Sequence, residues 1–126
     1  MNKLTWLLRI VGTIQLVLGL LYLLAPGAVL TAMGHTLPAA DIYYPLAMLA
    51  ARFIAYGVVL IYISNAATQN RLWIDGMILI QLIDLAAGAY YTAIGAVPLS
   101  LSGFPMFNAI WIIALLGFWR PQRVNA

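Results

Sequence analysis

The chain has 126 residues, of which 65% are hydrophobic and only 7% are charged, and its mean hydropathy is +1.00. Soluble domains carry about 25% charged residues, so this composition excludes a water-soluble globular protein and indicates an integral membrane protein. The absence of cysteine excludes disulfides, thiol redox chemistry and iron–sulfur clusters, and the net charge of +3 forms no basic run that would indicate nucleic-acid binding.

Four segments are mostly apolar and about twenty residues long, which is the length that a helix needs to cross a bilayer. They cover residues 4–24, 43–64, 72–95 and 103–119. Backbone groups in lipid must hydrogen-bond within their own segment, and the segments are too long for barrel strands, so each is predicted to be a helix. We predict a single domain over residues 1–126, an all-α integral membrane four-helix bundle.

The first segment resembles a signal peptide in its opening lysine, Lys3, and in the LLAPGA stretch that follows its apolar run. Its apolar stretch is about twenty residues long, however, which is beyond the usual length of a signal-peptide core. It also carries Arg9 and Gln15. We therefore expect this segment to be retained as the first span.

Stretches with turn-forming residues separate the four spans. The first connection contains GAVLTAMG, which favours a short helix lying on the outer surface of the membrane. The other two connections contain NAATQNR and AVPLSLS. Pro105 follows the last of them and is expected in the first turn of the fourth helix, where proline is tolerated.

Basic residues lie on only one side of the predicted spans. Lys3 precedes the first span, Arg71 lies between the second and third, and Arg120 and Arg123 follow the fourth, whereas the two opposite connections contain no lysine or arginine. By the positive-inside rule, both termini and the connection around Arg71 are predicted to be cytoplasmic, in a bacterial inner membrane. Asp75 is predicted to pair with Arg71, four residues earlier on the same helix.

Each predicted helix has a strongly polar side chain near the middle of the membrane. At 1.5 Å per residue, Arg52 and Asp84 both lie roughly 18 Å from the cytoplasmic ends of their helices, and Gln15 and Asn108 lie roughly 16 Å from theirs. An unpaired charge at the bilayer centre costs about 2.5–3.5 kcal/mol on insertion scales. We therefore expect Arg52 and Asp84 to form a buried ion pair inside the bundle, with the amides satisfying their remaining hydrogen-bonding groups.

Further polar and aromatic residues follow these side chains at helical spacing. Gln81 and Tyr91 share a side of the third helix with Asp84, and Tyr56 shares a side of the second helix with Arg52. The predicted ligand-binding residues are Gln15, Arg52, Tyr56, Gln81, Asp84, Tyr91 and Asn108. The same pair of charges has a simpler interpretation, in which it only fixes which helices are neighbours.

The stretch LLRIVGTIQLVLGLLYLLAP, residues 7–26, resembles the first helix of DoxX-like small bacterial membrane proteins, through Arg9, Gly19, Leu20 and Pro26. The lysine that often follows that glycine in DoxX proteins is missing, which places this chain in a divergent branch, and related small four-helix families of unassigned function fit equally well. The resemblance implies an accessory membrane subunit of respiratory or redox systems, tied in some members to quinone reduction. No catalytic residue carries over.

Three functional hypotheses are compatible with these observations. In the first, the bundle binds a small amphipathic or quinone-like molecule: Arg52 orients a carbonyl or anionic group, Asp84 holds the arginine, the amides hydrogen-bond the ligand and the tyrosines form its walls. In the second, the chain is an assembly or accessory subunit, and the ion pair only locks the bundle. In the third, it is a small proton-coupled transporter that uses Asp84 and acts as a homodimer.

Recognisable catalytic motifs and metal-ligand spacings are absent from the sequence, so we do not expect an enzyme, and we assign no catalytic or metal-binding residues. A quinone-like ligand is the only cofactor that the sequence suggests. The expected partners are the lipid bilayer and either another membrane protein or a second copy of the chain.

Overall fold

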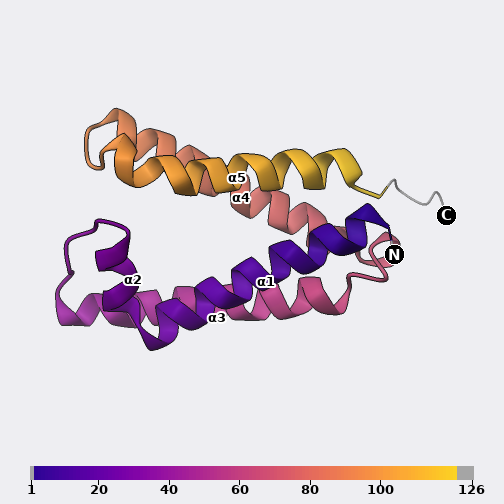
Figure 1. The fold of residues 1–126 in the computed structure, drawn as a ribbon, viewed down its shortest axis with the longest axis horizontal. Helices are drawn as coiled ribbons and strands as arrows, with labels where there is room; N and C mark the ends of the chain where they lie inside the picture. Colours follow the sequence, from indigo (N-terminus) through magenta and orange to yellow (C-terminus); the bar gives the residue numbers. More distant parts are fainter. Residues whose placement is uncertain (1, 122–126) are drawn as a thin grey trace. The chain divides into compact units, whose positions relative to one another are not determined.

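The structure is a computed structural model that describes residues 2–121, and every regular element in that range is helical. The long helices are α1 (Lys3–Leu24), α3 (Tyr43–Tyr62), α4 (Arg71–Ala93) and α5 (Leu99–Trp119) (Figure 1). All four are long and apolar enough to cross a membrane. The prediction of an all-α chain with four membrane-length helices is therefore confirmed, and this composition suggests a multi-pass membrane protein. Arg123, which entered the predicted orientation, lies outside the described residues.

The chain divides into two compact units. The first, called the α1–α3 unit, is Leu8–Tyr62. The second, called the α4–α5 unit, combines Met1–Leu7 with Ile63–Ala126.

Glycines bring α1 and α3 into backbone contact within the α1–α3 unit. A Cβ atom added at Gly12 would lie 2.8 Å from the carbonyl oxygen of Gly57, and one added at Gly19 would lie 2.9 Å from that of Ala50. Because Gly12 lies against Gly57 and Gly19 against Ala50, the two helices run antiparallel. Small residues are the usual means by which membrane helices approach so closely.

The connection between α1 and α3 contains a further helix, α2 (Pro26–Ala32), with proline in its first turn. This helix confirms the short helix predicted in the first connection, although its position on the membrane surface stays a prediction. Tyr22 near the end of α1 donates a hydrogen bond to Met33 Sδ at 3.4 Å, and its ring stacks on that of Phe53 with 6.3 Å between centroids. A 3-10 turn at Ala40–Ile42 then leads into α3.

The second unit consists mainly of α4 and α5, which also run antiparallel. After a 3-10 turn at Thr68–Asn70, α4 begins at Arg71. At the far end of this hairpin, Thr92 Oγ1 lies 2.6 Å from Ser102 Oγ. A Cβ atom added at Gly88, one turn earlier in α4, would lie 2.7 Å from Met106 Cγ. These contacts fix the register in which the two helices pack.

The start of α5 differs from the prediction. The helix begins at Leu99 rather than at residue 103, because Pro98 is its extended N-cap and the amides of Leu101 and Ser102 both donate to the Pro98 carbonyl. Pro105 consequently lies inside the helix and not in its first turn, so that expectation was wrong. The other ends of the long helices lie within two residues of the predicted ones.

Candidate functional site

The predicted ligand-binding residues are distributed over both units. Gln15, Arg52 and Tyr56 belong to the α1–α3 unit, and the others belong to the α4–α5 unit: Gln81, Asp84, Tyr91 and Asn108. The predicted contact between Arg52 and Asp84 would join the two units and stays a prediction. Each unit therefore contains one part of the predicted site.

Arg52 lies in the middle of α3, and its side chain is exposed. Its Nη1 donates to the backbone carbonyl of Met48, one turn earlier, at 2.8 Å. The arginine borders a shallow, open hollow on one face of α3, whose other lining residues are Pro45, Met48 and Leu49. A single guanidinium thus lies at the edge of an otherwise apolar surface depression.

Gln15 and Tyr56 lie at similar levels of the α1–α3 unit. The register that brings Gly12 to Gly57 and Gly19 to Ala50 places Gln15 opposite Ile54, which is about half a helical turn from both Arg52 and Tyr56. Gln15 is 2% exposed and Tyr56 is half-buried. The structure therefore brings the three predicted residues of this unit to neighbouring levels, with Arg52 the most exposed of them.

The α4–α5 unit places Asp84 and Asn108 at similar levels. The register fixed by Gly88 with Met106 places Asn108 within one turn of Asp84 along the hairpin. Asn108 is half-buried and its Oδ1 accepts a hydrogen bond from Trp111 Nε1 at 3.0 Å. Asp84 is exposed and, within this unit as far as it is described, its carboxylate has no hydrogen bond or ion pair.

The remaining two predicted residues of α4 have different surroundings. Gln81 is 2% exposed, and its Nε2 donates to Met77 Sδ at 3.3 Å. Tyr91 is exposed and packs edge-on against Tyr90, with 5.2 Å between the ring centroids. Gln81 therefore contributes to the packed interior, whereas Tyr91 and Asp84 lie on exposed surface.

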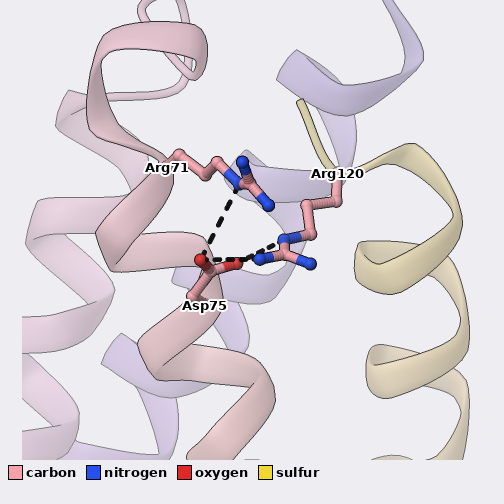
Figure 2. A network of polar contacts seen from close by, with 3 residues as sticks. All are labelled: Arg71, Asp75 and Arg120. Carbon is pink, nitrogen blue, oxygen red and sulfur yellow. Dashed lines mark hydrogen bonds and ion pairs between the residues drawn. The ribbon is translucent and has the colours of Figure 1, made fainter. Parts of the chain in front are cut away.

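A second polar cluster lies at the other end of the hairpin, where α4 begins and α5 ends. Arg71 Nε lies 3.8 Å from Asp75 Oδ2, which confirms the predicted pair (Figure 2). The structure adds a contact with Arg120 that was not predicted from the sequence: its Nη2 donates to Asp75 Oδ2 at 2.9 Å, and its Nε lies 2.6 Å from Oδ1. These ion pairs are partly exposed, with 33% of the Asp75 side chain and 41% of the Arg120 side chain accessible.

The contact between Arg120 and Asp75 could have been predicted from the orientation of the helices. The predicted orientation placed Arg71 and Arg120 on the same side of the membrane, so a carboxylate just inside either helix would be within reach of both. Lys3 lies at this end as well, with its Nζ 5.9 Å from the centroid of the Trp119 ring. A buried ion pair of the kind predicted for mid-membrane depth is not found within either unit over residues 2–121.

No protein-family model matches this chain, and the comparisons with curated proteins and with solved structures also gave no match. The resemblance of residues 7–26 to DoxX-like proteins therefore stays a prediction.

Proposed function

We propose that this chain is a multi-pass protein of the bacterial inner membrane that binds a small amphipathic or quinone-like molecule through Arg52. In this proposal Arg52 donates hydrogen bonds to a carbonyl or anionic group of the ligand. Asp84, Gln81 and Asn108 supply further polar contacts from α4 and α5, as the sequence predicts. Gln15, Tyr56 and Tyr91 complete the predicted site.

The observation that carries the proposal is the exposed guanidinium of Arg52 beside an apolar hollow in the middle of α3. A guanidinium has several N–H donors and stays charged at any ordinary pH, and one backbone carbonyl, that of Met48, does not satisfy such a group. Asp41 is the only acidic residue of the α1–α3 unit, and it precedes α3. A polar ligand at the hollow would supply the missing acceptors.

The packing of the helices within each unit does not depend on the charges of Arg52 and Asp84. Close backbone contact through Gly12, Gly19 and Gly57 holds α1 against α3 without Arg52. Asp75 with Arg120 at one end, and Thr92 with Ser102 at the other, join α4 to α5 without Asp84. Neither mid-membrane charge is therefore needed to hold the helices of its own unit together.

The charge distribution supports the proposed topology with both termini cytoplasmic. Lys3, Arg71 and Arg120 gather at one end of the α4–α5 unit, together with Trp119. Clustered basic residues favour the cytoplasmic side, and tryptophan is enriched where a membrane helix meets the aqueous interface. This end is therefore the proposed cytoplasmic end of the unit.

The proposal can be tested by extracting the lipid-soluble molecules that co-purify with the protein and identifying them by mass spectrometry. Wild type and Arg52→Gln would be purified from the same membranes in the same detergent. We expect the amount of quinone-like molecule that co-purifies with the variant to be about tenfold lower than with wild type, because charge-assisted hydrogen bonds are worth about 1.5–3 kcal/mol each.

Arg9→Gln is the matched control, since it removes an arginine near the end of a different membrane-length helix. It should retain the ligand at the wild-type level. Equal amounts of every co-purifying molecule in wild type and Arg52→Gln would contradict the proposal.

An accessory or assembly subunit is the second candidate, because α5 exposes large aromatic side chains. Phe104, Phe107 and Phe118 are 77%, 63% and 88% exposed, respectively. Such a surface suits lipid or a neighbouring membrane helix, and a second copy of the chain or another membrane protein would be the partner. Cross-linking in intact membranes tests this candidate, which predicts a discrete cross-linked species from a photoreactive group at Phe107.

A further inference from the structure

The Arg71–Asp75–Arg120 cluster carries more positive than negative charge. Two guanidinium groups, those of Arg71 and Arg120, approach one carboxylate (Figure 2). Arg120 takes the carboxylate at short range, through one hydrogen bond at 2.9 Å and one ion-pair contact at 2.6 Å. The carboxylate of Asp75 is therefore paired mainly with Arg120.

Arg71 is left with donors that no group satisfies. Its closest approach to Asp75 is 3.8 Å, which is too long for a hydrogen bond. Its Nε and Nη1 atoms are buried and have no hydrogen-bond partner among the described residues. A buried donor on a charged group is costly to leave unsatisfied. A negatively charged hydrogen-bond acceptor should therefore bind beside Arg71.

The position of the cluster in the helices indicates where that acceptor comes from. Arg71 is the first residue of α4 and Arg120 directly follows α5, so both lie where an apolar helix stops. Leu72 and Phe118, next to these ends, are 81% and 88% exposed. Trp119 is also at this end, with Lys3 beside its ring. This combination of basic residues and tryptophan at helix ends is typical of the headgroup layer of a membrane.

We infer that Arg71 and Arg120 bind the phosphate group of an anionic phospholipid headgroup, with Lys3 adding a third positive charge at the same end. Arginine binds phosphate oxygens through parallel pairs of N–H donors, and 21% of the Arg71 side chain is accessible to such a group. Asp75 holds Arg120 in place and limits the charge of the site. This site is independent of the one proposed around Arg52.

The test measures binding of defined lipids to the purified protein by native mass spectrometry. Phosphatidylglycerol and phosphatidylcholine would be titrated separately, and the first binding constant would be compared between them. The wild type should prefer phosphatidylglycerol. Arg71→Gln should weaken binding of this lipid about tenfold, because it removes a charge and its hydrogen bonds together.

Asp75→Asn separates a binding role from a merely structural one. Removing the carboxylate adds one net positive charge to the cluster, so phosphatidylglycerol binding should tighten about fivefold, which corresponds to about one interfacial charge. A cluster that only holds α4 to α5 would instead bind the lipid more weakly, or equally, after this change. Gln69→Ala, an exposed neighbour of the cluster, is the local control and should leave binding unchanged.

Inorganic phosphate distinguishes a lipid headgroup from a free anion. An excess of it should not displace phosphatidylglycerol from the wild type, because the acyl chains of the lipid pack on the exposed apolar side chains nearby. Displacement by phosphate, equal affinity for the two lipids, or wild-type binding by Arg71→Gln would each overturn the inference. Circular dichroism and size-exclusion chromatography of every variant establish that the comparison is made between folded proteins.

Discussion

Gly12 and Gly57 meet so closely that a Cβ atom added at Gly57 would lie 2.6 Å from the carbonyl oxygen of Gly12 and 2.7 Å from the amide nitrogen of Leu16. Both neighbouring atoms belong to the backbone of α1, so a side chain at this position cannot be accommodated by a rotamer change. The contact between α1 and α3 therefore depends on these two glycines.

Gly57→Ala should destabilise the protein by about 1–3 kcal/mol, since the two backbones must separate to admit one methyl group. The measurement is the apparent Tm in detergent. Gly117→Ala is the control, because Gly117 also lies inside a helix but has open space where its Cβ would be. Alanine there should leave the Tm unchanged or raise it slightly. Equal losses in the two variants would disprove the close contact.

Gly88→Ala tests a contact of a different kind. The Cβ atom would lie 2.7 Å from Met106 Cγ and 3.1 Å from Met106 Sδ, which belong to a flexible side chain and not to the backbone. Methionine adapts to neighbouring groups by changing rotamer, so we expect a loss below about 1 kcal/mol, smaller than that for Gly57→Ala. Apparent Tm values from the same detergent provide the comparison. A larger loss for Gly88→Ala would contradict this ranking.

Much of the fold could be predicted because the length of an apolar run and the turn-forming residues beside it are local features of the sequence, and they determine where a helix begins and ends. The bounds of α1, α3 and α4 follow from where apolar runs meet polar or turn-forming residues. The start of α5 could not be found in this way, because Ser100, Ser102 and Gly103 are typical of turns. In the structure Ser102 lies inside α5, and its hydroxyl lies 2.6 Å from Thr92 Oγ1 on α4.

Contacts between helices are harder to predict than the helices themselves. Helical spacing indicates which residues share a face, but the partner of a face depends on how the helices are arranged. Arg71 could be paired with Asp75 because they are four residues apart on one helix. Arg120, by contrast, is 45 residues from Asp75 in sequence, and their contact depends on the register of the α4–α5 hairpin. For the same reason, the predicted pairing of Arg52 with Asp84 is a hypothesis that needs its own experiment.

The two arginines that contact Asp75 should differ in their effect on stability. Arg120→Gln removes the short contacts to the carboxylate, whereas Arg71→Gln removes only an ion pair at 3.8 Å. The cluster is partly exposed, so we expect a loss of about 1 kcal/mol or less for Arg120→Gln and almost none for Arg71→Gln. Thermal unfolding at low and at high salt is the measurement, and salt should reduce the difference. A larger loss for Arg71→Gln would contradict the observed geometry.

Exchanging Arg52 and Asp84, the charges predicted to lie at mid-membrane depth, distinguishes a ligand site from a structural lock. Arg52→Asp alone should lower the amount of folded protein in the membrane, because two carboxylates then lie at the same predicted depth. Adding Asp84→Arg restores one positive and one negative charge and should return the amount of folded protein close to wild type. Ligand retention should stay lost in the double variant, since the guanidinium has moved from α3 to α4, away from the hollow bordered by Met48 and Leu49. The two readouts are folded protein by fluorescence-detected size exclusion and co-purifying molecules by mass spectrometry. A double variant that folds and also retains the wild-type ligand would rule out a binding role for Arg52 and favour the accessory subunit.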